Sequence, residues 1–373
     1  MERATDRYSR QERLPDFGPE GQRRLAAASV LVVGCGALGS VVAEQLARAG
    51  VGRLTLVDRD LVEESNLQRQ ALYTEQDALR AVPKAEAAKA RLAQVNSGVV
   101  VRAFVDDLRG SNAERYADGA DVIVDCLDNF ETRALLNNVA VARRLPLVYG
   151  GAVGSTGMCA LILPAGSGFG GRISWSEARG TPCLRCLLPE LPRPGEIATC
   201  ETAGVLGPAA GAVASIQSAM VIRLLAIGAD AVPAELVRID LASLSFSSSS
   251  LRGARDPGCA CCARRDFGHL ASSDAAPGFR VLCGRNAVEL RLGEGLPQEE
   301  FARLASRIAA AGPLSRSDVG GTCVLRVSLP APHEGDGPRT LSVVSTASAT
   351  VAVVDGTRDP EVARSVVARW IGM

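Results

Sequence analysis

The stretch SVLVVGCGALGS at residues 29–40 decides the fold of this chain. It opens with a short apolar run that ends in glycine, which is typical of a buried strand in a parallel sheet. The glycines Gly34, Gly36 and Gly39 follow in the spacing G-x-G-x-x-G, and VVAEQLARAG after them repeats apolar residues at helical spacing. LTLVD at 54–58 predicts the next strand. Strand, glycine turn, helix and strand in this order predict the βαβ unit of a doubly wound sheet.

The residues that follow continue the pattern of an α/β protein. Strands are predicted at 100–104, 121–126, 145–154 and near 235–247, and helices within 7–30 and near 84–95, 131–144 and 207–228. The Ala/Gly-rich run 201–230 is interpreted as a buried helix rather than a membrane span, because Glu201 and Arg223 interrupt it. The fold class is therefore α/β, with a doubly wound Rossmann-like sheet.

A second folding unit is expected at the C-terminal end. Residues 248–277 are rich in Ser and Cys and then polar, so we place a boundary near 275. Residues 1–275 are predicted to form the nucleotide-binding domain, and 278–373, with short alternating strands and two helices, a small α+β module. Asp359 as N-cap and Pro360 at the first helical position mark the start of its second helix.

Composition excludes several classes of protein. The 373 residues include 41 basic and 41 acidic side chains, and this neutral balance gives no electrostatic case for nucleic acid or an anionic membrane as partner. The N-terminal sequence MERATDRYSRQERL has no apolar run of a signal peptide, so a cytoplasmic location is expected. In a reducing compartment, the 11 cysteines favour metal binding or thiol chemistry over disulfides.

The glycine motif and the residue after the second strand predict a nucleotide site. Asp58 ends that strand, 19 residues after Gly39, where a carboxylate accepts hydrogen bonds from ribose hydroxyls. These two features alone make NAD the default ligand. A glycine turn that binds nothing is the alternative.

Charged residues beyond this motif favour ATP over a redox cofactor. The segment after the second strand reads DRDLVEESNLQRQ and supplies Asp58, Asp60, Asn66, Arg69 and Gln70. The Arg69 guanidinium matches phosphate oxygens, and Lys84, which opens the next helix, offers a second cation. Asp128 follows a strand at the edge where open α/β sheets bind ligands, and a carboxylate there holds Mg²⁺ beside phosphates.

Two cysteine pairs predict a metal site. Cys183 and Cys186 with Cys259 and Cys262 form a CxxC…CxxC pattern, which suits tetrahedral structural Zn²⁺ that ties two distant segments together. Cys261 is an alternative fourth ligand, and free thiols are the alternative to a metal site. Cys200, in ATCETAGVLGP, is either a nucleophile that receives an activated acyl group or a buried small apolar residue.

These motifs occur together in a known order. RYSRQ, GCGALGS, DRDLVEESNLQRQ, VPK, DCLDN, CLRC, TAGVLGP and PGCACC follow one another over about residues 7–265. The chain thereby resembles the ubiquitin-activating-enzyme-like adenylyltransferases of bacteria, namely the molybdopterin-synthase and thiamine sulfur-carrier adenylyltransferases. The resemblance implies that MgATP binds on the sheet and that the C-terminal Gly-Gly of a small ubiquitin-like sulfur carrier enters the site. The carrier carboxylate attacks the α-phosphate, giving acyl-adenylate and pyrophosphate.

The resemblance also implies a role for each residue. Asp58 holds ribose, Arg69 and Lys84 contact phosphates, Asn66 orients the phosphates or leaving group, Asp128 holds Mg²⁺, Arg10 reaches into the neighbouring subunit's site, and Cys200 matches a cysteine whose role differs among members. The Arg10 match implies a homodimer. A sulfur step would need a separate donor, a cysteine desulfurase or a rhodanese. Cys283 lacks the pattern of a rhodanese active loop, so module 278–373 is expected to grip the carrier or the dimer, or only to stabilise the fold.

Three other classes account for part of the pattern. An NAD-dependent oxidoreductase accounts for the glycines and Asp58, but not for Arg69, Lys84, Asp128 or the cysteine pairs. A non-catalytic relative of the same fold would lack the arginine, lysine or aspartate that this chain keeps. An adenylating enzyme of the same fold that acts on a small molecule, a peptide or a tRNA base stays open, as does the identity of the carrier.

Overall fold

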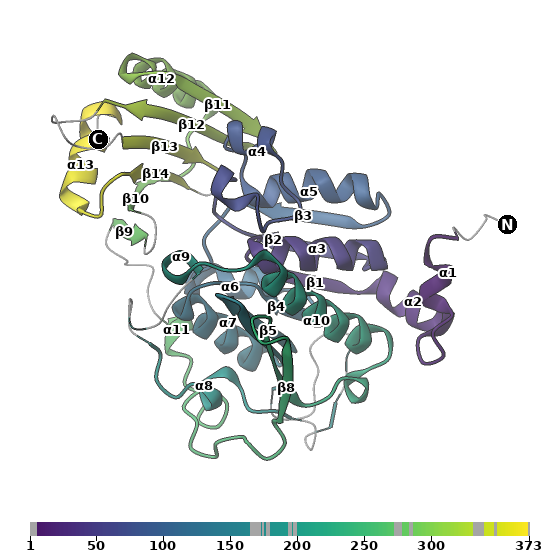
Figure 1. The fold of residues 1–373 in the computed structure, drawn as a ribbon. Coiled ribbons are helices and arrows are strands. Elements are labelled where there is room, and N and C mark those ends of the chain that lie inside the picture. The colour runs from purple at the N-terminus through teal and green to yellow at the C-terminus, as the bar shows by residue number, and fades with distance from the viewer. Residues whose placement is uncertain are drawn as a thin grey trace.

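Two β-sheets organise the protein (Figure 1). The computed structural model describes residues 6–164, 173, 175–176, 180–192, 196, 200–271, 278–282, 286–330, 339–346 and 349–371. The first sheet has eight strands in the order β3-β2-β1-β4-β5-β6-β7-β8, and the second has six in the order β11-β12-β13-β14-β10-β9.

The first sheet is parallel on one side and antiparallel on the other. Its parallel strands are β1 (Ser29–Val33), β2 (Arg53–Val57), β3 (Val100–Phe104), β4 (Val122–Asp125) and β5 (Leu147–Val153). The antiparallel strands are β6 (Thr156–Ile162), β7 (Glu235–Asp240) and β8 (Ser245–Ser250). The order 3-2-1-4-5 is that of a doubly wound sheet, so the predicted fold class is confirmed. Strand β6 was not predicted.

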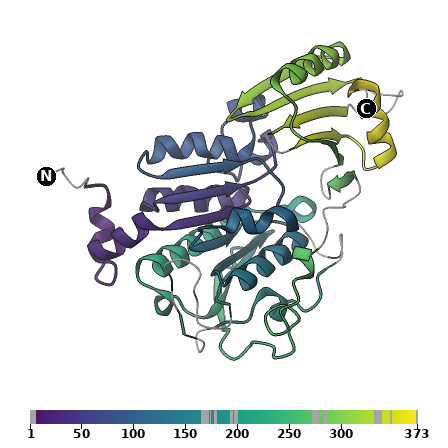
Figure 2. The same cartoon turned by 180° about the vertical axis from the view of Figure 1, so that it is seen from behind.

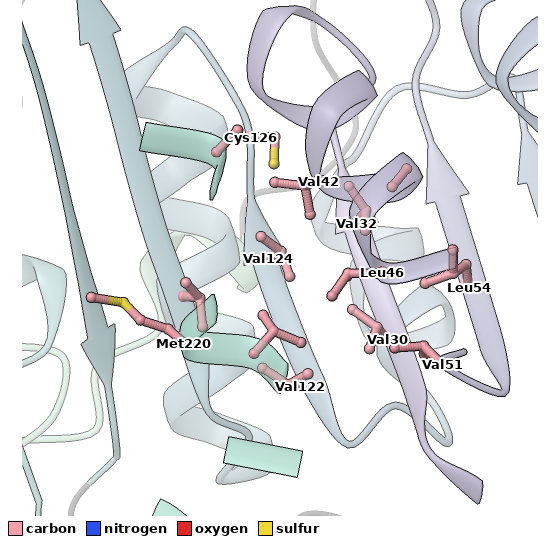
Figure 3. Packing of buried hydrophobic residues seen from close by; sticks show 14 of the residues in the cluster. Val30, Val32, Val42, Leu46, Val51, Leu54, Val122, Val124, Cys126 and Met220 are labelled. Carbon is pink, nitrogen blue, oxygen red and sulfur yellow. The ribbon is translucent and has the colours of Figure 1, made fainter. Parts of the chain in front are cut away.

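Helices cover both faces of the first sheet (Figures 1 and 2). Val30 and Val32 of β1 pack into one cluster with α3 (Ala37–Ala49), α5 (Lys84–Val95) and α10 (Gly207–Ala226), and Figure 3 shows part of this layer. The alternate residues Leu31 and Val33 pack into the other cluster with α6 (Gly110–Ala117) and α7 (Phe130–Arg143). Because successive strand residues point to opposite faces, a strand buried on both sides is apolar over most of its length, as β1 is from Val30 to Val33.

Helix α10 is a core helix, as predicted. Among the described residues it is the one helix long and apolar enough to cross a membrane, but 61% of its apolar window is buried inside the protein. It packs against α3 and β5.

The second sheet is antiparallel, and its two helices share one apolar core. Its strands are β9 (Phe279–Leu282), β10 (Ala287–Gly293), β11 (Leu314–Val319), β12 (Thr322–Leu329), β13 (Arg339–Ser345) and β14 (Thr350–Asp355). Phe301 of α12 (Gln298–Ile308) and Val367 of α13 (Pro360–Ile371) lie in the same cluster as strand residues. Helix α13 begins at Pro360, and Asp359 Oδ1 accepts a hydrogen bond from the Glu361 N–H at 2.9 Å, as the sequence predicts.

Short helices complete the described structure. They are η1 (Asp6–Tyr8), α1 (Ser9–Glu12), α2 (Gly18–Ala27), η2 (Glu64–Asn66), α4 (Glu75–Leu79), α8 (Leu184–Leu187), α9 (Cys200–Ala203), η4 (Ala229–Ala231), α11 (Gly268–Ala271) and η5 (Ala309–Ala311).

Candidate functional site

The glycine turn lies where the strand order of the first sheet reverses. Gly34 has φ +89°, and a Cβ there would lie 2.6 Å from the Cys126 carbonyl oxygen in the loop after β4. A Cβ on Gly39 would overlap the carbonyl oxygen of Gly34. Only glycines therefore allow the loops after β1 and β4 to pack this closely. This position, outside the carboxyl ends of two adjacent parallel strands, is where doubly wound sheets bind nucleotides.

Asp58 is fixed to this turn through its carboxylate. The Cys35 N–H donates to Asp58 Oδ2 at 2.6 Å, and the Asp60 N–H donates to Oδ1 at 2.7 Å. Burial raises the pKa of Asp58 to about 6, the Asp60 charge adds to this, and Lys84 and the two N–H donors act in the opposite direction. The carboxylate is thus held rigidly, ionised near pH 7 and more basic than an ordinary aspartate.

Lys84 is a buried cation beside this carboxylate. It is the first residue of α5, as predicted, and its Nζ lies 2.8 Å from Asp60 Oδ2. Its side chain is 8% exposed. Burial lowers the pKa of Lys84, but Asp60 and Asp58 outweigh it, so the pKa stays above its usual range. The ammonium is charged at physiological pH and is already placed near the glycine turn.

The motif after β2 folds into a compact turn that carries Arg69. Arg69 Nη1 donates to the Ser65 carbonyl at 2.8 Å, and the side chain is half-buried. Asn66 is buried, and its Oδ1 accepts from the Glu63 N–H at 3.2 Å. Asn66 therefore shapes the turn, in addition to any contact with a ligand.

Gln70 is a site residue to which the sequence assigned no role. It is 3% exposed, and its Oε1 has no hydrogen-bond partner among the described residues. Its Nε2 lies 3.9 Å from the position that a Cβ on Gly36 would take. A buried amide with an unsatisfied oxygen is costly, so its place beside the glycine turn suits a bound polar group.

Asp128 is exposed in the loop after β4, and an unpredicted arginine holds that loop. Arg133 of α7 donates to Asp125 Oδ2 at 3.3 Å and to the Gly150 carbonyl at 2.8 Å, and its Nη2 also donates to the Leu127 carbonyl. Arg133 is 4% exposed. Its buried guanidinium fixes the backbone on which Asp128 stands. The charge of Asp128 also helps to raise the pKa of Lys84, so the two groups lie within electrostatic reach.

Four cysteines from the two predicted pairs converge on one point. Their Sγ atoms all lie within 4.8 Å of one another, with 3.9 Å for Cys183–Cys186, 3.7 Å for Cys183–Cys259 and 3.4 Å for Cys186–Cys262. A tetrahedral zinc with Zn–S of about 2.3 Å requires sulfur–sulfur distances of roughly 3.8 Å. The donor set and spacing therefore fit Zn²⁺.

Cys261, next to this cluster, forms its hydrogen bonds with helix α7. Its Sγ accepts from Asn137 Nδ2 and donates to Asn138 Oδ1, both at 3.3 Å. Asn137 Oδ1 also accepts from the Leu184 N–H at 2.9 Å. Helix α7 thus holds both cysteine segments, and the geometry selects Cys262 over Cys261 as the fourth member of the cluster.

The last two predicted residues, Arg10 and Cys200, have no described contact with the nucleotide site. Arg10 is exposed on α1, and its neighbour Tyr8 accepts a hydrogen bond from Asn96 Nδ2 at 2.8 Å, which ties this segment to the end of α5. Cys200 begins α9, but its side chain lies outside the described residues, so the prediction for it stays a prediction.

Known proteins that are similar to this chain show its family. The model of the ThiF family matches residues 8–261. The sulfur carrier protein ThiS adenylyltransferase of Bacillus subtilis is 37% identical over 374 residues, which cover 99% of this chain and all of that protein. The SAMP-activating enzyme E1 of Haloferax volcanii is 38% identical over 257 residues, 69% of this chain and 88% of that protein. A structure of Escherichia coli MccB with ATP shares the fold at a TM-score of 0.56 and 22% identity, over 69% of this chain and 75% of that one. The chain belongs to the ThiF family.

Proposed function

We propose that this protein adenylates the C-terminal carboxylate of a small ubiquitin-like sulfur carrier at the expense of ATP. The observation that carries the proposal is the Asp58–Asp60–Lys84 network, built against the glycine turn with Arg69 on the adjoining segment. A hydride-transfer site needs neither the buried lysine nor the arginine, whereas a triphosphate matches both. The relatives that match over most of this chain are named for sulfur-carrier or SAMP activation, which supports a protein carrier as substrate.

Each group has a task in this reaction. Asp58 accepts hydrogen bonds from the ribose hydroxyls. The Gln70 Oε1 atom, which has no hydrogen-bond partner among the described residues, accepts a hydrogen bond from the bound nucleotide. Lys84 and Arg69 bind phosphate oxygens, and Asn66 keeps the turn that aims Arg69. The carrier carboxylate attacks the α-phosphorus while the α–β phosphoanhydride bond breaks, so pyrophosphate leaves with its electron pair. The two cations stabilise the charge that develops on the phosphates.

Mg²⁺ fits the exposed carboxylate of Asp128. A carboxylate with free oxygens beside phosphates is the ligand that Mg²⁺ uses in nucleotide sites, where the ion neutralises phosphate charge. Arg133 positions Asp128 by holding the backbone of the loop after β4. We assign Zn²⁺ to Cys183, Cys186, Cys259 and Cys262, where it has a structural role only, because all four ligands come from the protein.

Two further assignments concern partners. Arg10 is exposed on α1, and its neighbours Tyr8 and Gln11 tie that segment to the rest of the chain, which supports the proposal that the Arg10 side chain enters the site of a second copy in a homodimer. The acyl-adenylate would then be attacked by a sulfur nucleophile from a separate donor, a cysteine desulfurase or a rhodanese, with AMP as the leaving group.

The direct test is ATP–pyrophosphate exchange with purified protein and small proteins that end in Gly-Gly. Exchange that depends on one such carrier supports the proposal. Exchange that needs a small molecule or peptide instead would move the substrate to another class on the same fold.

A further inference from the structure

The six-stranded sheet contacts the nucleotide side of the first sheet through a shared arginine. Arg59 lies between Asp58 and Asp60, and its Nη1 is 3.4 Å from Glu289 Oε2 of β10 and 3.5 Å from Asp107 Oδ2. Its Nε is 3.9 Å from Asp60 Oδ1. The Glu289 side chain is 16% exposed, so this interaction is little screened by water. A residue of the C-terminal sheet thus forms an ion pair, without a hydrogen bond at Nη1, with the loop that carries Asp58 and Asp60.

An apolar contact lies next to this ion pair. Leu61 and Ala81 form one buried cluster with Val324 of β12 and Val344 of β13. Leu61 also bridges to Pro83, the residue before Lys84. The C-terminal sheet therefore packs on the segments at both ends of the Asp60–Lys84 pair.

A hairpin tip provides the third contact, on helix α5. Gly320, with φ +60°, lies between β11 and β12, and a Cβ there would overlap the carboxyl group of Glu86. Glu86 is buried and follows Lys84 by two residues. The hairpin thus covers the first turn of the helix that begins with Lys84, at a distance that glycine permits.

We propose that the β9–β14 sheet is a positioning element of the nucleotide site, with Glu289 and Gly320 as its positioning residues. Glu289 and Asp107 together hold the Arg59 guanidinium away from Asp60. When the Glu289 charge is removed, Asp107 alone holds the guanidinium less firmly, so Arg59 shifts toward Asp60 and competes with Lys84, whose Nζ lies 2.8 Å from the same carboxylate. Lys84 and the Asp58 loop then lose the arrangement that binds MgATP. This inference rests on the proposed function only in taking ATP as the nucleotide.

The test compares Glu289→Gln and Gly320→Ala in the full-length protein with Glu300→Gln, an exposed glutamate of α12 in the same module. The dissociation constant for MgATP is measured by calorimetry without carrier, and the KM values for ATP and for the carrier in pyrophosphate exchange. We expect Glu289→Gln to weaken MgATP binding about tenfold, the effect of about 1.4 kcal/mol, with the KM for carrier unchanged. Gly320→Ala should weaken binding in the same sense and Glu300→Gln should have no effect.

Two results would overturn the inference. Unchanged MgATP affinity in both folded variants, with only a lower melting temperature, would make the sheet a stabilising appendage. A changed KM for carrier with unchanged affinity for MgATP would make it a docking surface.

Wild-type protein that binds MgATP but exchanges pyrophosphate with no carrier would count against the proposed function alone, because the binding comparison still decides this inference. The double variant Arg59→Gln with Glu289→Gln should bind MgATP no more weakly than Arg59→Gln alone.

Discussion

Neighbouring cysteines offer a matched pair of variants for the metal assignment. Cys262 Sγ lies 3.4 Å from Cys186 Sγ, whereas the adjacent Cys261 forms hydrogen bonds with Asn137 and Asn138. Cys262→Ser should therefore remove a zinc ligand, and Cys261→Ser should leave the cluster complete. Serine retains a hydroxyl donor and acceptor for the two asparagines, so the second change should cost about 1 kcal/mol.

The size of the first effect follows from the four-ligand geometry. Structural zinc sites contribute about 10–16 kcal/mol in small peptides, so one ligand in four represents about 3 kcal/mol. At about 2 °C per kcal/mol for a large domain, the melting temperature should fall by about 6 °C. Burial raises the pKa of Cys186 to about 11, so these thiols need the cation to ionise near pH 7.

The assay is metal content by mass spectrometry together with thermal unfolding of both variants. We expect about one zinc per chain in wild type and Cys261→Ser, and a lower content with the loss of about 6 °C in Cys262→Ser. Zinc lost from Cys261→Ser but kept by Cys262→Ser would refute the ligand assignment, and wild type without metal would refute the site.

Three further predictions concern the nucleotide site. Asp128→Ala should lower pyrophosphate exchange more than about 100-fold while the melting temperature stays within about 1 °C, because the side chain is exposed; retained activity would argue against the magnesium role. Lys84→Met should abolish exchange and also destabilise the fold by about 1–2 kcal/mol in urea unfolding, since Asp60 loses its nearest cation but is 43% exposed. Adenosine, which has no phosphate to titrate, should bind with an affinity that falls below about pH 6, where Asp58 takes up a proton; a flat profile from about pH 5 to about pH 8 would contradict the ribose role. Because folding raises that pKa, the same group adds stability at low pH that is lost as the pH rises from about 4 to about 6.

The elements around the glycine turn could be predicted because their signals are local. The apolar run of β1, the glycine that needs φ +89° and the helix after it lie within residues 29–49. Strand β6 (Thr156–Ile162) was missed although its pairing with β5 is local, as in Val153 with Thr156 on either side of a two-residue turn. Its second pairing, with β7, joins Thr156 to Asp240 far along the chain, and periodicity in a short window contains no information on that contact.

The parts of the candidate site that could be predicted are those whose residue type and spacing along the chain indicate a chemistry. Asp58, Lys84 and the cysteine pairs have types and spacings that few other kinds of site share. Arg133 was not foreseen, because an arginine in a helix is ordinarily exposed, and its partners, the buried Asp125 and two backbone carbonyls, are brought to it by the fold. The choice of Cys262 over Cys261 also depends on α7, which lies far from both cysteines along the chain. The contact between Arg59 and Glu289 could not be predicted either, because the two residues lie far apart along the chain and neither local sequence indicates the partner.

The most direct test of the central claim is pyrophosphate exchange into ATP by the zinc-loaded, full-length protein, with and without each small Gly-Gly-ending protein of the same genome. We expect exchange that appears only with one such carrier, needs Mg²⁺ and is lost when the carrier's terminal glycine is removed. Folded protein that binds MgATP but gives no exchange with any carrier would contradict it.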